Sequence, residues 1–443
     1  MNRLPLHSAI SEYAGLDPAR FHMPGHKGRL SPLDVTEITG TDDLHAPGDA
    51  ILESERLCAE AVGAADAFFL VNGSTAGNLA MLFGVGVGKR ILLGRNCHKS
   101  VINGIALAGQ YAVPLFPDEN GLYSAEAVAE ALEKQPCDAV FITSPTYRGW
   151  VSPIDEIAEA AHSHGALLLV DAAHGAHFAF SELLPPVPSA ADMWCISTHK
   201  TLNALTQTAL LLTGESCPFT RDQVQRALNM FQSTSPSYEF MLSIESSVLR
   251  PADWDAHAAR VLALRERLEG IEGLKLIGSA DRRRADVTRL NIGMSGMNGY
   301  EICEALEKCR VYPEMADREC VTLITSPADP GEWYDRLISA LRGLCGSAGN
   351  APAFDKRTVF AGEQVMSVRS AVTGESESVL LSYAAGRICA QAVGCYPPGI
   401  AALFPGERIG RDSIAYLLEE AACGASIFGM SYGRILVVSE KHE

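Results

Sequence analysis

Ser197-Thr198-His199-Lys200-Thr201-Leu202-Asn203-Ala204-Leu205-Thr206-Gln207-Thr208-Ala209-Leu210-Leu211-Leu212 is the segment that decides the fold and the chemistry of this chain. The apolar run Met193–Ile196 precedes it and the apolar run Ala209–Leu212 closes it, and both runs are typical of buried strands. Lys200 between them is unusual because removing an ammonium group from water is costly. A lone lysine is most often an exposed turn residue. Alternatively, a lysine kept in a pocket, with its pKa lowered by its surroundings, forms a Schiff base with a carbonyl group.

Length and composition indicate a globular protein of two or three domains, because 443 residues are more than one core usually serves. The net charge of −17 argues against nucleic acid or an anionic membrane as a partner. The twelve cysteines contain no CxxC pair, which favours reduced thiols. Residues 1–10 have no apolar signal core, and no run approaches 18 apolar residues. We therefore expect a soluble cytoplasmic protein.

Residues 1–50 are predicted to form an N-terminal arm and not a domain. Phe21–Gly28 and Asp42–Gly48 are rich in turn formers and lack a helical or strand period. An ordered surface loop is the simpler interpretation. Three histidines in these loops, His22, His26 and His45, are more than solubility requires, so the arm is also a candidate cover for a site.

The first predicted strand and helix form a candidate phosphate site. We expect a strand over Ala67–Val71, a turn over Asn72–Thr75 and a helix over Ala76–Val85. Free backbone N–H groups and small hydroxyls at a helix N-terminus suit a phosphate, although a Ser/Thr helix cap is the common alternative. The glycine-rich segment Gly84–Lys89 lacks the first glycine of a Walker loop, and Arg90 stands where Ser or Thr should be, which excludes that motif.

Strands and helices alternate through the next hundred residues. We expect strands over Arg90–Leu93, Val113–Phe116, Ala139–Thr143, Leu167–Val170 and Asp192–Ile196, with helices over Ser124–Lys134 and Ile154–His164. This alternation predicts a parallel sheet covered on both faces, whose ligands bind at the carboxyl ends of the strands. Ser74, His98, Thr143 and Asp171 all fall at those ends.

Asp171 directly follows a buried strand and therefore needs a charged partner. A metal held by Asp171, His174 and His177 is one option. A protonated heteroaromatic nitrogen is the better one. A phosphate turn, a stacking imidazole, a buried carboxylate and a buried lysine at one sheet edge are together what pyridoxal 5'-phosphate requires. Because these other features accompany it at one sheet edge, Lys200 is predicted to be a Schiff-base lysine.

The second half of the chain predicts a smaller α/β domain. Helices over Trp254–Leu268, Tyr300–Lys308 and Gly331–Leu344 alternate with strands over Leu274–Ile277, Thr288–Ile292 and Val321–Ile324, followed by a linker at Gly346–Pro352, a helix over Ser378–Val393 and a shaped loop at Tyr396–Ile400. We divide the chain into the arm (1–50), a large cofactor domain (51–255), a small domain (256–345) and a C-terminal region (346–443). The last of these is expected to complete the small domain and the substrate pocket.

These residues resemble the pyridoxal-phosphate-dependent ornithine/lysine/arginine decarboxylases of the aspartate aminotransferase fold (fold type I), in a short form. The resemblance covers nearly the whole chain and lies in specific motifs, namely Phe21–Gly28, Val71–Asn78, Arg95–Ser100, Ser144–Tyr147, Asp171–Phe178, Ser197–Thr208, Pro313–Asp317 and Tyr396–Glu407. It implies an α/β fold with a large, mostly parallel-sheet cofactor domain and a smaller C-terminal α/β domain.

The resemblance also implies roles for single residues. Lys200 carries the cofactor, Asp171 holds its pyridine nitrogen and His98 stacks on its ring. Ser74, Thr75, Ser197 and His199 hold the phosphate, His174 is a further cofactor contact, and Thr234 reaches the phosphate of a second subunit, so that a homodimer with shared sites is the minimum unit. His26 and Glu407 are candidate substrate contacts. Arg148 departs from the family pattern, because a tyrosine is expected there, and an arginine facing the pocket would repel a cationic substrate.

The resemblance implies decarboxylation of an amino acid, most readily a basic one, to its amine. The substrate displaces Lys200, carbon dioxide leaves, and Lys200 or His98 returns a proton to Cα. Glu407 is a candidate partner for the distal cation, or simply a carboxylate at a helix start. An aminotransferase or another lyase on the same fold is the first alternative. A regulatory protein that senses the cofactor is the second, but it needs an attached binding module, which is not visible in this sequence.

Overall fold

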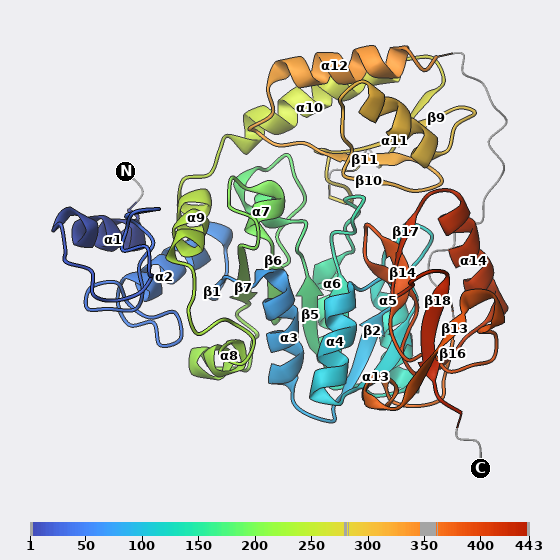
Figure 1. Cartoon of the computed structure of the whole chain (residues 1–443), viewed down its shortest axis with the longest axis horizontal. Helices are drawn as coiled ribbons and strands as arrows, with labels where there is room; N and C mark the ends of the chain where they lie inside the picture. Colours follow the sequence, from blue (N-terminus) through green and yellow to red (C-terminus); the bar gives the residue numbers. More distant parts are fainter. Residues whose placement is uncertain (1–2, 279–280, 282, 346–359, 361, 441–443) are drawn as a thin grey trace.

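The computed structural model describes residues 3–278, 281, 283–345, 360 and 362–440. A seven-stranded sheet forms its centre (Figure 1). The strand order is β1 (Asp66–Leu70), β7 (Ala209–Thr213), β6 (Met193–Ile196), β5 (Leu167–Asp171), β4 (Ala139–Thr143), β2 (Arg90–Gly94) and β3 (Tyr111–Leu115). The strands from β6 to β3 pair in parallel, and β7 is antiparallel to both of its neighbours. The predicted mostly parallel sheet is confirmed.

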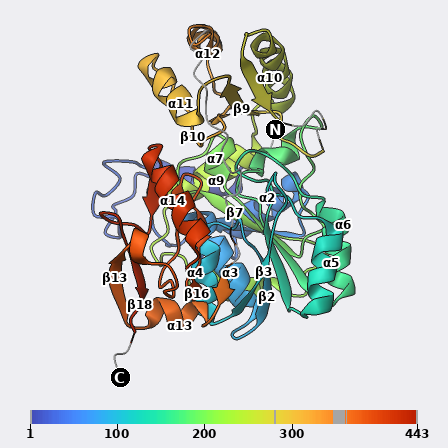
Figure 2. The same cartoon turned by 90° about the vertical axis from the view of Figure 1, so that its right-hand side faces the viewer.

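Both faces of this sheet are buried, which explains why its strands are continuously apolar. Alternate residues of a strand belong to different cores, as Phe69 does to one and Phe68 to the other. In Figure 2, α5 (Ala125–Lys134) and α6 (Ile154–Ser163) lie on one face of the sheet. The opposite face carries α3 (Gly73–Val85), α4 (Lys99–Ala108) and α8 (Arg221–Leu228).

The small domain lies above the carboxyl ends of the central strands in Figure 1. Its antiparallel sheet has the order β10 (Met315–Ala316), β11 (Val321–Ile324), β9 (Arg289–Met294) and β8 (Leu274–Ile277). The helices α10 (Trp254–Glu269), α11 (Gly299–Lys308) and α12 (Gly331–Arg342) share its core. The predicted helices and strands of this domain are confirmed.

The C-terminal residues build a separate hydrophobic cluster beside α4. Its elements are α13 (Val368–Thr373), α14 (Arg411–Ala422) and the strands β12 (Glu363–Gln364), β13 (Ser376–Leu380), β14 (Val393–Tyr396), β15 (Ile400–Leu403), β16 (Glu407–Arg408), β17 (Ser426–Phe428) and β18 (Arg434–Val438). The helix predicted over Ser378–Val393 is wrong. Ser376–Leu380 pairs along its full length with β18, and Gly386 has a φ of 81°, which interrupts a helix. The linker predicted at Gly346–Pro352 lies outside the described residues.

The N-terminal arm begins with α1 (Pro5–Gly15), which packs on α2 (Ala50–Val62) and α9 (Tyr238–Leu249). Residues 16–49 form turns without a helix or strand, as the sequence predicts. The twelve cysteines are free thiols. Among the described residues, none of the helices has the length and apolar character that a membrane crossing requires.

Candidate active site

The N-terminus of α3 forms one side of the site. The helix begins at Gly73, three residues earlier than predicted, so Ser74 and Thr75 lie in its first turn. Ser197, which follows β6, donates a hydrogen bond from Oγ to Ser74 Oγ over 3.0 Å. Backbone N–H groups of a first helical turn and two adjacent hydroxyls are suitable donors for a phosphate. The predicted phosphate residues Ser74, Thr75 and Ser197 therefore converge.

Asp171 is the last residue of β5 and is buried. Its Oδ2 accepts a 2.8 Å hydrogen bond from Asn78 Nδ2, and its Oδ1 accepts a 3.1 Å bond from the backbone N of Ala173. Asn78 also donates to Ser100 Oγ over 3.0 Å. No role is predicted for Asn78 from the sequence. The sequence does contain an indication, because an amide inside the apolar helix Ala76–Val85 needs a buried hydrogen-bond partner.

His98 caps the N-terminus of α4 and receives support from the C-terminal region. Its Nδ1 accepts from the backbone N of Ser100 over 3.2 Å, and burial lowers the pKa of the imidazole. Gly399 packs against the ring so closely that a Cβ there would lie 3.1 Å from His98 Cδ2. Gly399 also has a φ of 84°, which favours glycine. The shaped loop predicted at Tyr396–Ile400 is thus the support that fixes His98.

Lys200 lies in the short helix α7 (Thr198–Thr201), directly after β6. Its Nζ is 3.0 Å from His174 Nε2, and the other ring nitrogen of His174, Nδ1, is 3.2 Å from an Arg289 Nη2 donor. Burial lowers the pKa of Lys200; the charge of Asp171 opposes this shift and that of Arg289 adds to it. Lys200 is therefore a partly desolvated amine and not an exposed turn residue.

Tyr147 and Arg289 complete the surroundings of His174. The Tyr147 ring lies 4.4 Å from the His174 ring, and the Tyr147 hydroxyl contacts the carboxylate of Glu314. No role is predicted for Arg289 from the sequence, and the structure buries it at the start of β9. A charged residue inside the predicted strand Thr288–Ile292 is the signal that indicates a buried polar partner.

Other predicted residues make their side-chain hydrogen bonds and ion pairs outside this group. His199 Nδ1 contacts the carbonyl O of Thr208 at 2.8 Å. His26 pairs with Asp34 of the arm over 3.0 Å. Glu407 forms a buried ion pair with Arg95, 3.2 Å between Oε2 and Nη2, and lies in β16 and not at a helix start. The roles of His26 and Glu407 as substrate contacts stay predictions.

Thr234 is exposed on the turn that precedes α9. The neighbouring Ser233 donates its backbone N–H to Asn72 Oδ1 over 3.1 Å, so this turn begins beside the α3 N-terminus of its own chain. Thr234 therefore lies on a turn that is close to the candidate site of its own chain. Its role in a second subunit stays a prediction that rests on the family resemblance.

Arg148 is held by two carboxylates. Its guanidinium bonds Glu319 over 2.8 Å and also contacts Asp317. These acidic partners on the β10–β11 segment compensate its charge, so the repulsion of a cationic substrate expected from Arg148 alone is reduced.

The contacts of the two histidines argue against a metal held by Asp171, His174 and His177. His177 pairs with Asp286 at 3.0 Å, while His174 faces Lys200.

The residues at this edge of the sheet fit pyridoxal phosphate. The lysine amine, the carboxylate and the phosphate-type helix N-terminus are the three groups that this cofactor needs. In addition, three of the twelve side-chain atoms that are buried without a hydrogen-bond partner in the described part of the chain lie on these elements, namely Asn78 Oδ1, Thr143 Oγ1 and Thr201 Oγ1. Buried polar atoms of this kind indicate a site for a polar ligand.

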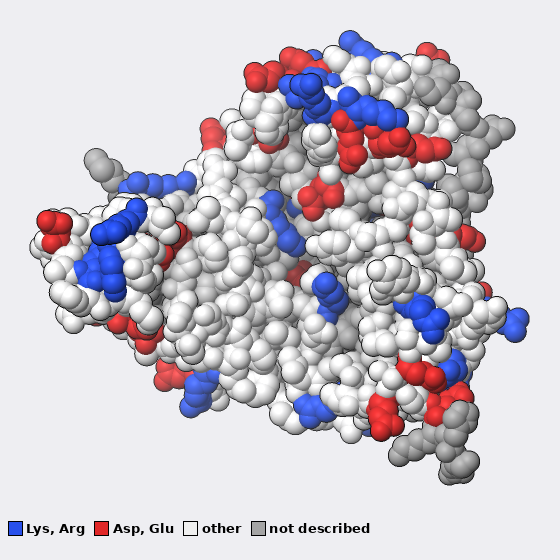
Figure 3. Space-filling view, viewed as in Figure 1, with Lys and Arg blue, Asp and Glu red and all other residues white. Residues whose placement is uncertain are grey.

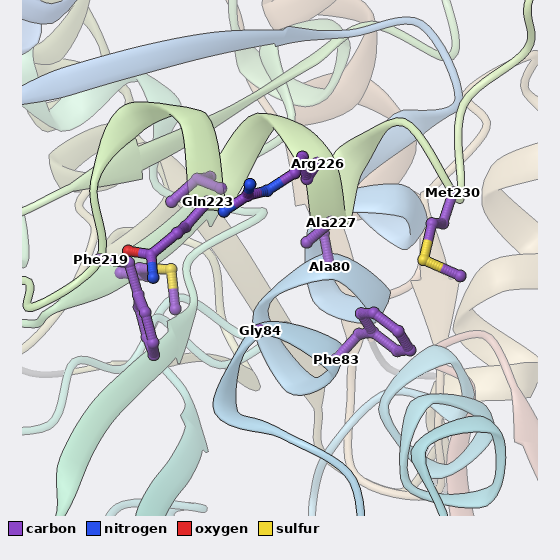
Figure 4. A pocket seen from close by; sticks show the side chains of 10 residues that line it. Ala80, Phe83, Gly84, Phe219, Gln223, Arg226, Ala227 and Met230 are labelled. Atoms are coloured by element: carbon purple, nitrogen blue, oxygen red, sulfur yellow. The ribbon is translucent and has the colours of Figure 1, made fainter.

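A pocket of about 290 Å³ lies between α3 and α8 (Figure 4). Phe83, Phe219 and Met230 line it together with Arg226. Phe83 belongs to the end of α3 opposite Ser74. The pocket contains none of the candidate active-site residues and is separate from Lys200.

The strand order of the sheet, with a lysine after β6 and a carboxylate after β5, defines the class as fold type I of the pyridoxal-phosphate enzymes. Comparison with known proteins identifies the family. Residues 29–252 match the Orn/Lys/Arg decarboxylase major domain, and residues 350–431 match the C-terminal domain of the same family. The chain belongs to the Orn/Lys/Arg decarboxylase family and is an amino acid decarboxylase, which is a lyase.

Three known proteins show the extent of the similarity. An uncharacterized protein of Bacillus subtilis is 34% identical, covering 93% of each chain. An arginine decarboxylase of the same species is 31% identical, covering 96% of this chain and 95% of the relative. The solved structure of the constitutive lysine decarboxylase of Escherichia coli is 18% identical with a TM-score of 0.82, covering 99% of this chain and 82% of that one.

Proposed function

We propose that this protein binds pyridoxal 5'-phosphate at Lys200 and decarboxylates a basic amino acid, with arginine as the first candidate. One observation carries the proposal: the partly desolvated amine of Lys200 lies at the same sheet edge as the Asp171 carboxylate and the α3 N-terminus. Arginine is the first candidate because relatives that match almost the whole chain are named arginine decarboxylase.

Each residue of the site has a task that its contacts support. The cofactor, when bound, supplies an electron-accepting ring that stabilises the charge left at Cα as carbon dioxide departs. Asp171, oriented by Asn78, holds a negative charge where the ring nitrogen has to stay protonated. Ser74 and Ser197 anchor the phosphate. His98, backed by Gly399, covers the ring, and either His98 or Lys200 delivers the proton to Cα.

Acidic side chains beside the site support a cationic substrate. Glu314 contacts the Tyr147 hydroxyl, and its charge raises the pKa of Lys200 against the effect of burial. Asp317 and Glu319 lie on the same segment and bind Arg148. A guanidinium or ammonium group entering from this side meets negative charge.

The test combines labelling with a substrate panel. Borohydride reduction of the purified protein followed by peptide mapping should place the cofactor on Lys200, and Lys200→Ala should be colourless and inactive. Release of carbon dioxide should be fastest with arginine, lysine or ornithine in a panel of amino acids. Cofactor on another lysine would refute the site, whereas release only from acidic or aromatic amino acids would refute the substrate class.

We further propose that the protein acts in the cytoplasm as a homodimer with shared sites. Figure 3 shows a broad face with few charged side chains over α7, α8 and α9. Leu205 and Met230 are exposed in this region. The arm exposes Phe21, which is 96% accessible, and Leu30. Apolar side chains exposed in this way are typical of surfaces that a second subunit covers.

A further inference from the structure

Arg289 reaches from the small domain to the side of His174 that faces away from Lys200. It is the first residue of β9 and is almost fully buried. Its Nη2 lies 3.2 Å from His174 Nδ1 and 3.3 Å from the His174 carbonyl O, and its Nε lies 3.4 Å from Asp286 Oδ2. A Cβ at Gly149 would lie 2.7 Å from Arg289 Cγ, so the loop of the large domain leaves space for this side chain.

The chemistry of the guanidinium decides which ring nitrogen of His174 carries the proton. An arginine side chain only donates hydrogen bonds, so His174 Nδ1 has to accept and carries no hydrogen. Burial lowers the pKa of His174 well below its ordinary value, and the charge of Arg289 lowers it further, so the imidazole is neutral. A neutral imidazole without hydrogen on Nδ1 carries it on Nε2.

The Nε2–H group then points at the amine of Lys200, 3.0 Å away. A nitrogen that accepts this hydrogen bond needs a free lone pair, which an ammonium group lacks. We infer that Arg289 is a positioning residue: through the tautomer of His174, it stabilises Lys200 as the neutral, nucleophilic amine. The small domain thereby controls the reactivity of a lysine that belongs to the large domain.

Other charges around Lys200 act on the amine without passing through His174. Arg289 itself also acts directly by its charge, so the test must separate charge from tautomer. Besides His174 and Arg289, the titratable groups that act on Lys200 or contact its helix are Asp171, His98, Cys195, His199 and Glu314.

The first measurement is the tautomer of His174 in the cofactor-free protein, by ¹⁵N spectroscopy of histidine-labelled protein. His174→Gln identifies the signal by its loss. In the unsubstituted protein, Nε2 should be protonated and Nδ1 should not. Protonation of Nδ1 at neutral pH, alone or together with Nε2, overturns the inference, and this readout requires no substitution at Arg289 to fold.

The second measurement is the apparent pKa of Lys200, from competitive acetylation of the cofactor-free protein across a pH series. Arg289→Met should raise this pKa and lower the neutral fraction of the amine about tenfold at neutral pH. Arg289→Lys, which keeps a hydrogen-bond donor, should restore most of the neutral fraction of the Lys200 amine. Arg318→Met, which removes another buried arginine of the small domain, is the matched control and should have no such effect.

A double-substitution comparison separates the two effects. In His174→Gln the amide nitrogen replaces the Nε2–H donor and no tautomer remains to be set. If Arg289 acts through the tautomer, Arg289→Met raises the Lys200 pKa less in this background than in the unsubstituted protein. An equal rise in both backgrounds shows a direct charge effect and overturns the inference. The inference rests on the proposed role of Lys200, but both readouts are independent of cofactor binding and of turnover, so either proposal can fail alone.

Discussion

At the scale of the residue, the site depends on a few charges removed from water. Asp171, Lys200 and Arg289 are each costly to bury alone, and each has a specific polar partner in the structure. Such groups are retained where chemistry needs them, and their removal changes function more than it changes the fold.

Replacing Asp171 tests the carboxylate that we propose to face the ring nitrogen of the cofactor. Asp171→Asn keeps the shape of the side chain and can still accept from the backbone N of Ala173, so the fold should persist. Turnover should fall by about 10²–10³-fold, because a preorganised charge is lost where charge develops. Carbon dioxide release and cofactor absorbance measure the two properties. Near-normal turnover with bound cofactor would mean that Asp171 is only structural.

The buried carboxylate of Asp286 should make the free energy of unfolding fall at acidic pH. Burial by itself would raise the pKa of the Asp286 carboxyl group. His177, Arg289 and Thr288 outweigh burial, so the pKa lies below its ordinary value of 3.8. The stability that Asp286 contributes is therefore present above about pH 4 and is lost as the pH falls below that value. Asp286→Asn should cost about 3–5 kcal/mol at pH 7, because it leaves buried charges unpaired.

Urea unfolding at pH 7 and at several values below pH 4 checks this prediction. The difference between Asp286→Asn and the unsubstituted protein should shrink as the pH falls. Asp335→Asn is the control, because this exposed carboxylate pairs with Arg267 on the surface of the small domain. A difference that stays constant at every pH would contradict the assigned cause.

At the scale of the element, the arm is fixed by one remote carboxylate. Glu245 on α9 accepts from the backbone N–H groups of Leu6 and His7 over 2.8 and 2.9 Å, and Ser54 of α2 also contacts it. Leu4, the residue before α1, provides no side-chain cap, so Glu245 supplies the acceptor that the helix start needs.

Removal of this carboxylate should release α1. Glu245→Ala removes the acceptor of the His7 N–H group and one of the two acceptors of the Leu6 N–H group, which keeps Ser54 Oγ at 3.2 Å, and should lower the free energy of unfolding by about 1–3 kcal/mol. Limited proteolysis should then cut within residues 5–15, and urea unfolding measures the loss. Glu60→Ala, on the exposed face of α2, should change neither result. A protected α1 in Glu245→Ala would show that packing alone fixes the arm.

At the scale of the whole molecule, the sheet, the small domain and the C-terminal region meet at one site. The sheet contributes Asp171 and the lysine after β6, the small domain contributes Arg289, and the C-terminal loop contributes Gly399. From the family resemblance, we propose that a second subunit also contributes residues to this site.

Complementation tests whether two chains share a site. A Lys200→Ala chain is mixed with a chain in which Thr234 and Ser235 are both alanine. If the turn serves the partner, some mixed dimers contain one site with intact Lys200 and an intact turn, so activity should exceed that of either parent. No gain after verified subunit exchange, with both parents impaired, would count against the shared site. That outcome would agree with the contact of Ser233 with Asn72 of its own chain.

The central sheet and the family can be predicted from the sequence alone, and the same local signals lead to the proposal that Lys200 is the cofactor lysine. Continuous apolar strands, a turn with small hydroxyls and a carboxylate after a buried strand are local signals, and the fold brings their strand ends to one edge because the sheet is parallel. The helix predicted over Ser378–Val393 failed because pairing with the distant β18 outweighed local preference.

Only the tertiary structure decided the partners of these residues. The contacts of Asn78 with Asp171, of Arg289 with His174 and of Arg95 with Glu407 span 93, 115 and 312 positions of sequence. No local pattern encodes such a pair, because either residue could satisfy its buried polar atoms in many ways. The packing of the domains selects one of these arrangements, and with it the protonation states on which the chemistry depends.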